Sequence, residues 1–315
     1  MKINPEYKDG IQLDAYREIK CLQELRHPNI VQLNSVFTTK DQTISLVLEH
    51  LPLGDLEELW KNKDILYQAP DVKAWALMLS QAVWFCHANH ILHRDIKGSN
   101  VLIAADGTAK LADFGLARKF ADPGRAMTFL VITRFYRPPE LLYEATHYSA
   151  KVDIWSTACV IAELCLRDWF LPSDTDAGQL SIVTETFGTP TEESWPGVSK
   201  LSKYVAPENS NKTRGRPMSW WRERLRLLGE DGVDMVRGML RLDPKKRFNA
   251  DEVLNHRYWT NEPKPSRAEE LMLRIEMGKA EKRKREDERK RGGAEVESGR
   301  ADKVARKLDF GSMRK

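Results

Sequence analysis

The sequence lacks the features that mark disulfide-rich, zinc-ribbon and membrane-spanning proteins. Only four of its 315 residues are cysteines, and no two of them have the CxxC spacing of a zinc ribbon. No apolar run approaches the ~20 residues that a membrane helix needs. The opening residues, MKINPEYKDG, contain no apolar segment of a secretory signal. We therefore expect a protein of a reducing compartment, without a membrane partner.

Acidic and basic residues nearly balance over most of the chain. Residues 1–262 contain 33 Lys and Arg against 35 Asp and Glu, whereas residues 263–315 contain 17 against 11. A nucleic-acid-binding domain carries its basic surplus on its folded surface. Direct nucleic-acid binding is therefore not expected, and binding through the basic tail is the weaker alternative.

Hydrophobic periodicity predicts a mixed α+β protein in which strands lie early and helices dominate after residue 50. Asp71 can cap a long helix. Residues 152–166 are apolar nearly all round, which predicts a helix buried on every side. The predicted helices are residues 13–26, 71–89, 152–166, about 177–187, 222–240 and 250–256, and the predicted strands are residues 30–37 and 44–48.

The composition changes after Glu262. Pro263 and Pro265 mark a boundary, and residues 279–291 are almost entirely charged. This composition predicts that residues 263–315 form a basic tail that is disordered or a solvated helix. The run KRKR at 282–285 matches a nuclear import pattern.

A polar segment after the long helix predicts a site for chemistry. Asp106-Gly107 is a strong signal for a two-residue hairpin turn. Such a turn places Asn100 directly opposite Asp113, while Asp95 and Lys97 lie on the loop just before the hairpin. Oxygen donors beside an ammonium group are what a magnesium-phosphate site requires.

Two motifs in this segment resemble those of protein kinases. The residues HRDIKGSN at 93–100 resemble the catalytic loop, and DFG at 113–115 resembles the magnesium loop. The resemblance runs from residue 1 to about residue 262. It implies a bilobal kinase fold with a truncated, β-rich N-lobe over 1–51 (the regulatory helix and two strands) and a mostly helical C-lobe over 52–262.

The resemblance also implies the catalytic roles. Asp95 is expected to accept the proton of the substrate hydroxyl, and Lys97 to stabilise the γ-phosphate of ATP. Asn100 and Asp113 are expected to hold Mg²⁺.

Further positions match the nucleotide site of the family. Glu49, Leu51, Asp55 and Leu102 are expected to contact ATP. Glu18 matches the acidic residue of the regulatory helix that pairs with a strand lysine near the phosphates.

Three more matches concern the framework of the C-lobe. Glu140 and Arg247 are expected to pair in the interior, where loss of one partner would leave a buried charge. Asp153, at the start of the buried helix, is expected to hold the backbone of the catalytic loop.

Two longer segments narrow the resemblance. KDGIQLDAYREIKCLQELRHPNI and DPGRAMTFLVITRFYRPPE are similar to cyclin-dependent kinases, most of all to the CDK-activating kinase branch, the kinase subunit of general transcription factor H in fungi. This implies a nuclear, ATP-dependent Ser/Thr kinase. Its partners would be a cyclin and an assembly factor. Its protein substrates would be the RNA polymerase II C-terminal repeats and the activation segments of other cyclin-dependent kinases.

Thr128 matches the activating phosphosite of the family. A phosphate adds nearly two negative charges and needs guanidinium partners. Arg17, Arg94 and Arg118 match the arginine cluster that binds it, and each comes from a different element.

The end of the activation segment matches a substrate-binding turn. By resemblance, Ile132 and Arg137 imply a preference for proline after the phosphorylated Ser or Thr.

One family feature is missing from the sequence. No GxGxxG motif occurs among the 18 glycines, and no strand lysine precedes the regulatory helix. We interpret this as an incomplete N-lobe, since Ile30, Leu33, Leu46 and Leu48 would otherwise face water on an open sheet. We expect little activity from these 315 residues alone. The alternative is a catalytically inactive kinase-like scaffold that binds a cyclin.

Overall fold

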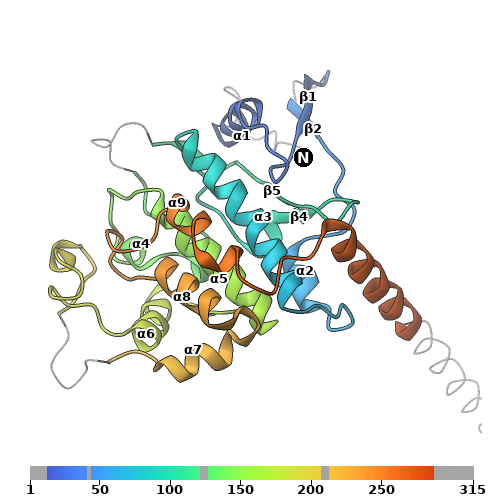
Figure 1. The fold of residues 1–315 in the computed structure, drawn as a ribbon. Helices are drawn as coiled ribbons and strands as arrows, with labels where there is room; N and C mark the ends of the chain where they lie inside the picture. Colours follow the sequence, from blue (N-terminus) through green and yellow to red (C-terminus); the bar gives the residue numbers. More distant parts are fainter. Residues whose placement is uncertain (1–12, 41–43, 121–126, 207–212, 287–315) are drawn as a thin grey trace, which may run out of the picture.

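The computed structural model describes residues 13–40, 44–120, 127–206 and 213–286, with side chains from Tyr16 onward. A small part with one helix and a two-stranded sheet sits on a larger, mostly helical part (Figure 1). The elements are α1 (Leu13–Glu24), β1 (Leu33–Thr38), β2 (Ile44–Leu48), α2 (Leu56–Lys61), α3 (Ala69–Ala88), β3 (Ile91–Leu92), β4 (Val101–Ile103), β5 (Ala109–Leu111), β6 (Arg118–Lys119), α4 (Pro139–Leu142), α5 (Lys151–Leu166), α6 (Asp176–Phe187), α7 (Met218–Arg224), α8 (Gly229–Met239) and α9 (Ala250–Leu254).

The small part has a thinly covered sheet. Strands β1 and β2 pair antiparallel, with Val36 opposite Leu46, and the Phe37 side chain is half exposed. Ile30, one of the four apolar residues expected to need cover, is buried and bridges to Leu111 of β5. Leu33, Leu46 and Leu48 are half-buried. Ile30 is therefore buried at the junction between the two parts, whereas most side chains of β1 are exposed.

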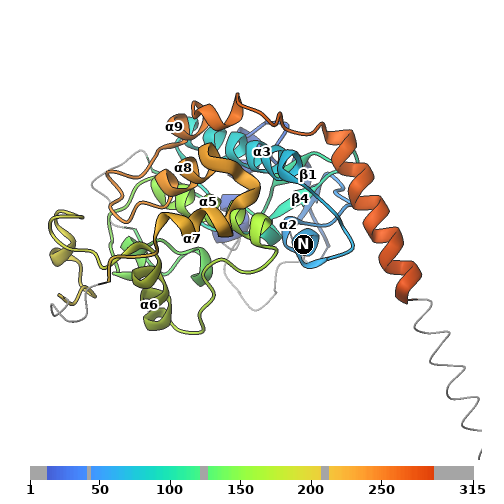
Figure 2. The ribbon, with the colours of Figure 1, turned by 60° about the horizontal axis from the view of Figure 1, so that its bottom comes forward.

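The core of the larger part is built around α5. Every residue of this helix from Val152 to Leu164 is buried, which confirms the prediction of a helix buried on all sides. Helices α3 and α8 pack against it (Figure 2). Trp155 of this helix is completely enclosed and contacts Phe187 of α6 at 5.0 Å between ring centroids. This is the predicted α+β arrangement, with a small strand-containing part and a larger, mostly helical part.

The long helix begins earlier than predicted. Helix α3 starts at Ala69 with Gln68 as its N-cap, so Asp71 is not the cap. Instead, the Asp71 carboxylate accepts a hydrogen bond from the Gln68 main-chain N–H at 2.7 Å in a reciprocal capping box. Pro70 fits the first turn because its missing N–H would have no partner there.

The helix predicted over 222–240 is two helices. Helix α7 ends at Arg224, a short 3₁₀ turn covers Arg226–Leu228, and α8 begins at Gly229. Gly229 has φ +63°, a backbone conformation that interrupts a continuous helix and that glycine adopts without steric cost.

The hairpin between β4 and β5 has a different register from the predicted one. Val101 lies opposite Leu111 and Ile103 opposite Ala109, so Asn100 faces Ala112 rather than Asp113. The turn is one residue longer than predicted, because Ala104 N–H donates to the Thr108 carbonyl at 2.9 Å and three residues lie between them. Gly107 supplies the positive φ of +91° that such a three-residue turn needs.

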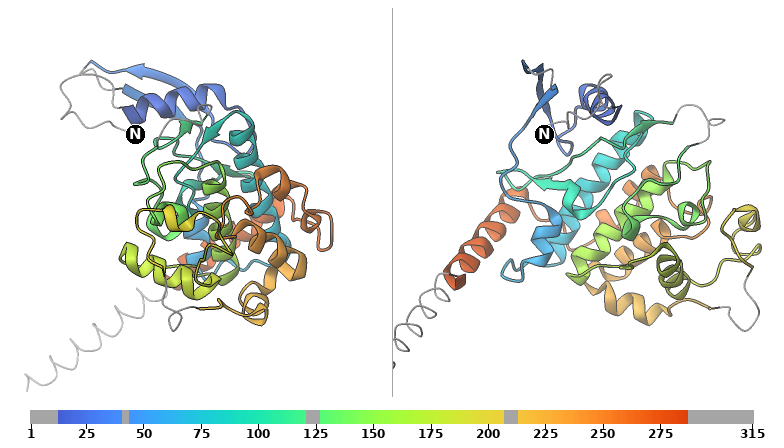
Figure 3. Two further views of the ribbon diagram at one scale, coloured as in Figure 1. Left: turned by 90° about the vertical axis from the view of Figure 1, so that its left-hand side faces the viewer. Right: turned by 180° about the vertical axis from the view of Figure 1, so that it is seen from behind.

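The predicted tail begins with a helix over 268–286 that leaves the molecule at one side (Figures 2 and 3). This helix is not wholly solvated, because Leu271 and Ile275 are fully buried. Gly278 lies directly against Ile65, where a Cβ atom would come within 2.6 Å of the Ile65 backbone. Residues 287–315 lie outside the described part. Among the described residues, no helix combines the length and apolar character required to cross a membrane.

Candidate functional site

The catalytic-loop segment brings Asp95 and Lys97 together. The Lys97 ammonium donates to Asp95 Oδ2 at 2.8 Å, and the Thr133 hydroxyl donates to Asp95 Oδ1 at 2.8 Å. Lys97 Nζ also lies 3.4 Å from Thr133 Oγ1. The carboxylate is therefore held between the catalytic loop and the activation segment.

These contacts keep Asp95 ionised. Burial by itself would raise the pKa of this carboxyl, but the hydrogen bonds from Lys97 and Thr133 outweigh burial and lower the pKa below its ordinary value. An ionised carboxylate can accept a hydrogen bond from a hydroxyl group and then take its proton. Asp95 thus has the charge state that a general base requires.

Asn100 contacts this carboxylate, and Asp113 lies close enough to the rings and carboxylates behind it to act on their charge. Asn100 Nδ2 donates to the Asp95 carbonyl at 2.8 Å and to Asp95 Oδ2 at 3.1 Å, which leaves the amide oxygen as the atom able to bind a cation. Asp113 is exposed and has φ +63°. Burial is the largest effect on the pKa of the His93 ring and lowers it. The carboxylates of Asp95 and Asp113 both act in the opposite direction, which shows that both lie near this ring.

This donor set fits a hard divalent cation. Carboxylate and amide oxygens are the ligands that Mg²⁺ prefers, and no soft sulfur ligand is nearby in the motif. In the observed hairpin register Ala112 lies opposite Asn100, and Asp113 follows one residue later with a left-handed φ of +63°.

The catalytic loop is held from behind by Asp153, as predicted. Its carboxylate is fully buried and accepts the main-chain N–H groups of His93 and Arg94, each at 2.9 Å. The His87 ring nitrogen Nε2 lies 3.0 Å from the same carboxylate. Burial alone would raise the pKa of Asp153. The pKa is nevertheless lowered, mainly by the hydrogen bond from His87. Arg94 has φ +64°, so these bonds also stabilise an uncommon backbone conformation.

Glu18 lies inside the junction between α1 and the catalytic segment. Its side chain is buried, and both burial and the neighbouring carboxylate of Asp113 raise its pKa. A buried carboxylate beside a second carboxylate is a position where a cation is stabilising. Lys2, a lysine before α1 that could pair with Glu18, lies outside the described residues.

The residues matched to the nucleotide site lie along the connection between the two parts. A β-bridge joins Asp55 to Leu102. Asp55 also caps α2, accepting the Glu58 N–H at 2.8 Å, and burial raises its pKa. Leu51 is half-buried. The Glu49 carboxylate is bonded to Lys110 Nζ at 2.9 Å and to the Gln32 N–H at 2.8 Å, and the Glu49 N–H donates to the Gln32 carbonyl at 3.0 Å. The main-chain carbonyl of Glu49 is therefore the group left for a nucleotide.

Thr128 is exposed on the activation segment, and Tyr148 connects it to the catalytic loop. The Tyr148 hydroxyl donates to the Thr128 carbonyl at 2.8 Å and accepts from Arg94 Nη1 at 3.2 Å. Arg118 lies on β6 and is paired with Leu92 of β3, and Leu92 precedes Arg94 by two residues. Arg17 is half-buried on α1. The matched arginines thus come from three different elements.

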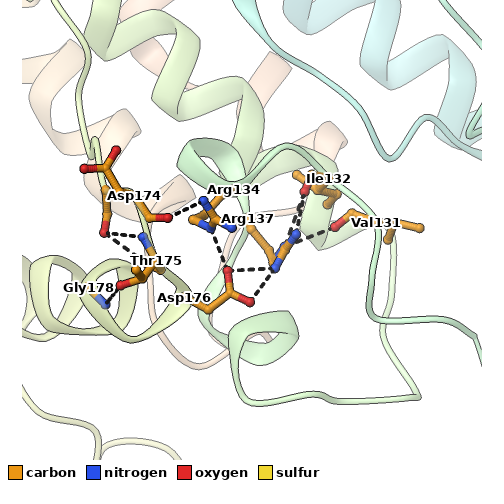
Figure 4. Close-up of polar contacts among 9 residues, drawn as sticks. Val131, Ile132, Arg134, Arg137, Asp174, Thr175, Asp176 and Gly178 are labelled. Atoms are coloured by element: carbon orange, nitrogen blue, oxygen red, sulfur yellow. Dashed lines mark hydrogen bonds and ion pairs between the residues drawn. The ribbon is translucent and has the colours of Figure 1, made fainter.

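The matched substrate-binding turn is built around Ile132 (Figure 4). Ile132 is buried with φ +69°, which for a β-branched residue costs about 1–3 kcal/mol. Arg137 stabilises this turn, because its Nη2 donates to the Ile132 carbonyl at 3.2 Å and its Nε to the Val131 carbonyl at 3.2 Å. A substrate would therefore meet a carbonyl that is already hydrogen-bonded.

The predicted interior pair is present. Arg247 donates to both oxygens of Glu140, at 2.7 and 2.8 Å, and both side chains are buried. This two-point geometry provides the hydrogen bonds that a desolvated charge pair needs.

Sequence reasoning missed three residues of the site. Thr133 holds Asp95, Tyr148 links Arg94 to Thr128, and Asp176 on α6 contacts Arg134 and Arg137. Thr133 could have been found from its place directly after Ile132. Asp176 is about 40 residues from its partners, and no local pattern signals such a contact.

Comparison with known proteins places this geometry in a family. The sequence profile described as "Protein kinase domain" matches residues 2–259. Serine/threonine-protein kinase KIN28 of Saccharomyces cerevisiae is 42% identical over 272 residues, covering 85% of this chain and 86% of that protein. Cyclin-dependent kinase 7 of Xenopus laevis is 43% identical over 265 residues, covering 83% and 72%.

Solved structures agree with the sequence relatives. A structure of the CAK complex from Chaetomium thermophilum bound to ATP-gamma-S contains a chain with a TM-score of 0.82 and 55% identity, over 86% of this chain and 84% of that one. A crystal structure of the yeast RNA Pol II CTD kinase CTDK-1 complex gives a TM-score of 0.79 and 31% identity, over 85% and 87%. A protein kinase domain implies ATP and a metal ion as cofactors. The chain belongs to the protein kinase family, and within it to the cyclin-dependent serine/threonine kinases.

Proposed function

We propose that this protein phosphorylates serine or threonine followed by proline, with Asp95 as the residue that accepts the proton of the substrate hydroxyl. The observation that carries the proposal is the Asp95 carboxylate held by Lys97 and Thr133, each at 2.8 Å. Asp95 orients the hydroxyl, and the Lys97 ammonium offsets negative charge on the transferred phosphoryl group.

Asn100 and Asp113 are the proposed ligands of Mg²⁺, which when bound would neutralise phosphate charge. The nucleotide would lie along Glu49, Leu51, Asp55 and Leu102, with Glu18 at the phosphate end. The bridge between Asp55 and Leu102 supports this placement, because it brings two segments of the proposed site side by side.

The proposed regulation joins Thr128 to Arg17, Arg94 and Arg118. Phosphate on Thr128 would add charge that three guanidinium groups from separate elements can bind. The Tyr148 bridge supports this, because it already connects Thr128 to Arg94. A cyclin would dock on α1, the regulatory helix, and an assembly factor would complete the complex.

The proposed substrates are the RNA polymerase II C-terminal repeats and the activation segments of other cyclin-dependent kinases, in the nucleus. The names of the similar structures support this, since one is a CAK complex and the other an RNA Pol II CTD kinase complex.

The test uses the protein purified from its own cells through a tag after Lys315, together with whatever subunits accompany it. An Asp95→Asn variant should phosphorylate a Ser-Pro peptide at least about 100-fold more slowly, because the base is lost while the side-chain shape is kept. Asp174→Asn, an acid on the loop before α6, should keep the wild-type rate. A wild-type complex that contains a cyclin and phosphorylates no Ser-Pro peptide would favour the inactive scaffold instead.

A further inference from the structure

Asp176 connects the two arginines that surround the substrate-binding turn (Figure 4). Arg134 Nε donates to Asp176 Oδ1 at 2.7 Å, and Arg137 Nη1 lies 3.4 Å from both carboxylate oxygens. Arg134 Nη1 also donates to the Asp174 main-chain carbonyl at 2.8 Å. One carboxylate on α6 therefore fixes the orientation of both guanidinium groups.

The position of Asp176 is itself well determined. It is the first residue of α6, directly after the N-cap Thr175, whose hydroxyl accepts the Gly178 N–H at 3.0 Å. A carboxylate in the first turn is also favoured by the helix dipole. The hydrogen bond from Arg134 is the largest of the effects that lower the pKa of Asp176, so the carboxylate is ionised at neutral pH.

The turn that these arginines hold lies next to the reacting groups. Thr133, which donates to Asp95, immediately follows Ile132. A substrate hydroxyl at Asp95 would therefore place the next substrate residue close to the Ile132 carbonyl. Arg137 already occupies that carbonyl through Nη2 at 3.2 Å and Nε at 3.3 Å.

We propose that Asp176 is a specificity-determining positioning residue, which acts through Arg137 to exclude substrates that lack proline after the phosphorylated residue. This inference rests on the proposed function and extends it. Asp176 restrains the guanidinium on its Nη1 side, so that the other side stays on the Ile132 carbonyl. A substrate residue with an N–H then finds no acceptor and is left with an unpaired donor, whereas proline has no N–H to lose.

The test compares kcat/KM for two peptides that differ only in Pro or Ala after the phosphorylated serine, using the tagged complex. Asp176→Asn should lower the Pro-to-Ala ratio about five- to tenfold, mainly by raising the rate on the Ala peptide. Asp176→Glu should restore much of the ratio, because it retains the charge. The matched control is Asp174→Asn, which should keep the full ratio because Arg134 uses the main-chain carbonyl of Asp174.

The possible results separate the two proposals. If wild type prefers the Pro peptide and Asp176→Asn keeps the wild-type ratio, or slows both peptides equally, Asp176 has only a structural role and the inference is overturned alone. If wild type phosphorylates both peptides equally, the proposed proline preference is overturned and the inference with it. A fall in the ratio with Asp176→Asn but not with Asp174→Asn supports both.

Discussion

The catalytic loop and the substrate-binding turn are each held by an aspartate carboxylate, one buried and one exposed. Each is positioned by a carboxylate in the first turn of a helix, Asp153 on α5 and Asp176 on α6. Asp153 is completely buried, whereas the Asp176 side chain is 54% exposed. Asp153 binds main-chain N–H groups, and Asp176 binds arginine side chains.

This difference has a physical consequence. Removing a buried charged partner leaves desolvated groups unpaired and costs about 3–5 kcal/mol, whereas an exposed ion pair contributes about 0–1 kcal/mol. The buried Asp153 can therefore hold the loop whose geometry the chemistry requires. In its proposed role, the exposed Asp176 adjusts which substrates the turn accepts without a large effect on stability.

The largest effect is expected from removing the buried carboxylate. Asp153→Ala should lower the free energy of unfolding by about 3–5 kcal/mol, because the N–H groups of His93 and Arg94 lose their acceptor inside the protein. Denaturant unfolding of the purified protein measures this. Asp174→Ala is the exposed control and should change stability far less. Equal losses of unfolding free energy for the two variants would show that the burial of Asp153 does not add to its contribution to stability.

The second prediction tests whether the substrate-binding turn also has a buried support. Glu163 on α5 accepts the hydroxyl of Tyr136, four residues after Ile132, at 2.9 Å, and burial raises the pKa of Glu163 to about 8. The group is protonated in the folded protein but ionises above about 4.5 when unfolded. Wild-type stability should therefore fall as the pH rises from 5 to 8.

Glu163→Gln should remove this dependence, so that the variant gains up to about 3 kcal/mol relative to wild type between pH 5 and pH 8. Thermal unfolding at several pH values measures it. The exposed Glu185→Gln serves as the control and should follow the wild-type curve. A difference between wild type and Glu163→Gln that is constant with pH would contradict the prediction.

The smallest effect concerns Tyr148, which joins the catalytic loop to the activation segment. Tyr148→Phe removes the hydroxyl between Arg94 and the Thr128 carbonyl and should cost about 0.5–1.5 kcal/mol. Hydrogen exchange over residues 127–133 should become faster, because the activation segment loses a link to the catalytic loop.

A matched tyrosine makes this result specific. The Tyr204 hydroxyl donates to the Pro190 carbonyl at 3.0 Å, far along the chain from the activation segment. Tyr204→Phe should cost a similar free energy without changing exchange over 127–133. If both variants leave that exchange unchanged, Tyr148 does not connect the activation segment to the catalytic loop.

Local patterns predicted the elements better than their junctions. The enclosed α5 followed from its continuous apolar sequence, and the interior pair of Glu140 and Arg247 followed from the family resemblance. The hairpin register was wrong by one residue, because an Asp-Gly pair fits both a two-residue and a three-residue turn. The helix breaks between α7 and α8 where Gly229 adopts a positive φ. A single glycine within a helical pattern does not predict such a break.

By itself, the sequence determined which chemical groups the catalytic segment carries, because Asp95, Lys97, Asn100 and Asp113 are close together along the chain. Tertiary structure alone decided which distant groups hold this segment, since Thr133 contacts Asp95 across 38 residues and Asp153 accepts the main-chain N–H of His93 across 60 residues. The physical reason is that periodicity and turn chemistry act over a few residues. A contact between remote segments depends instead on how whole helices pack around α5.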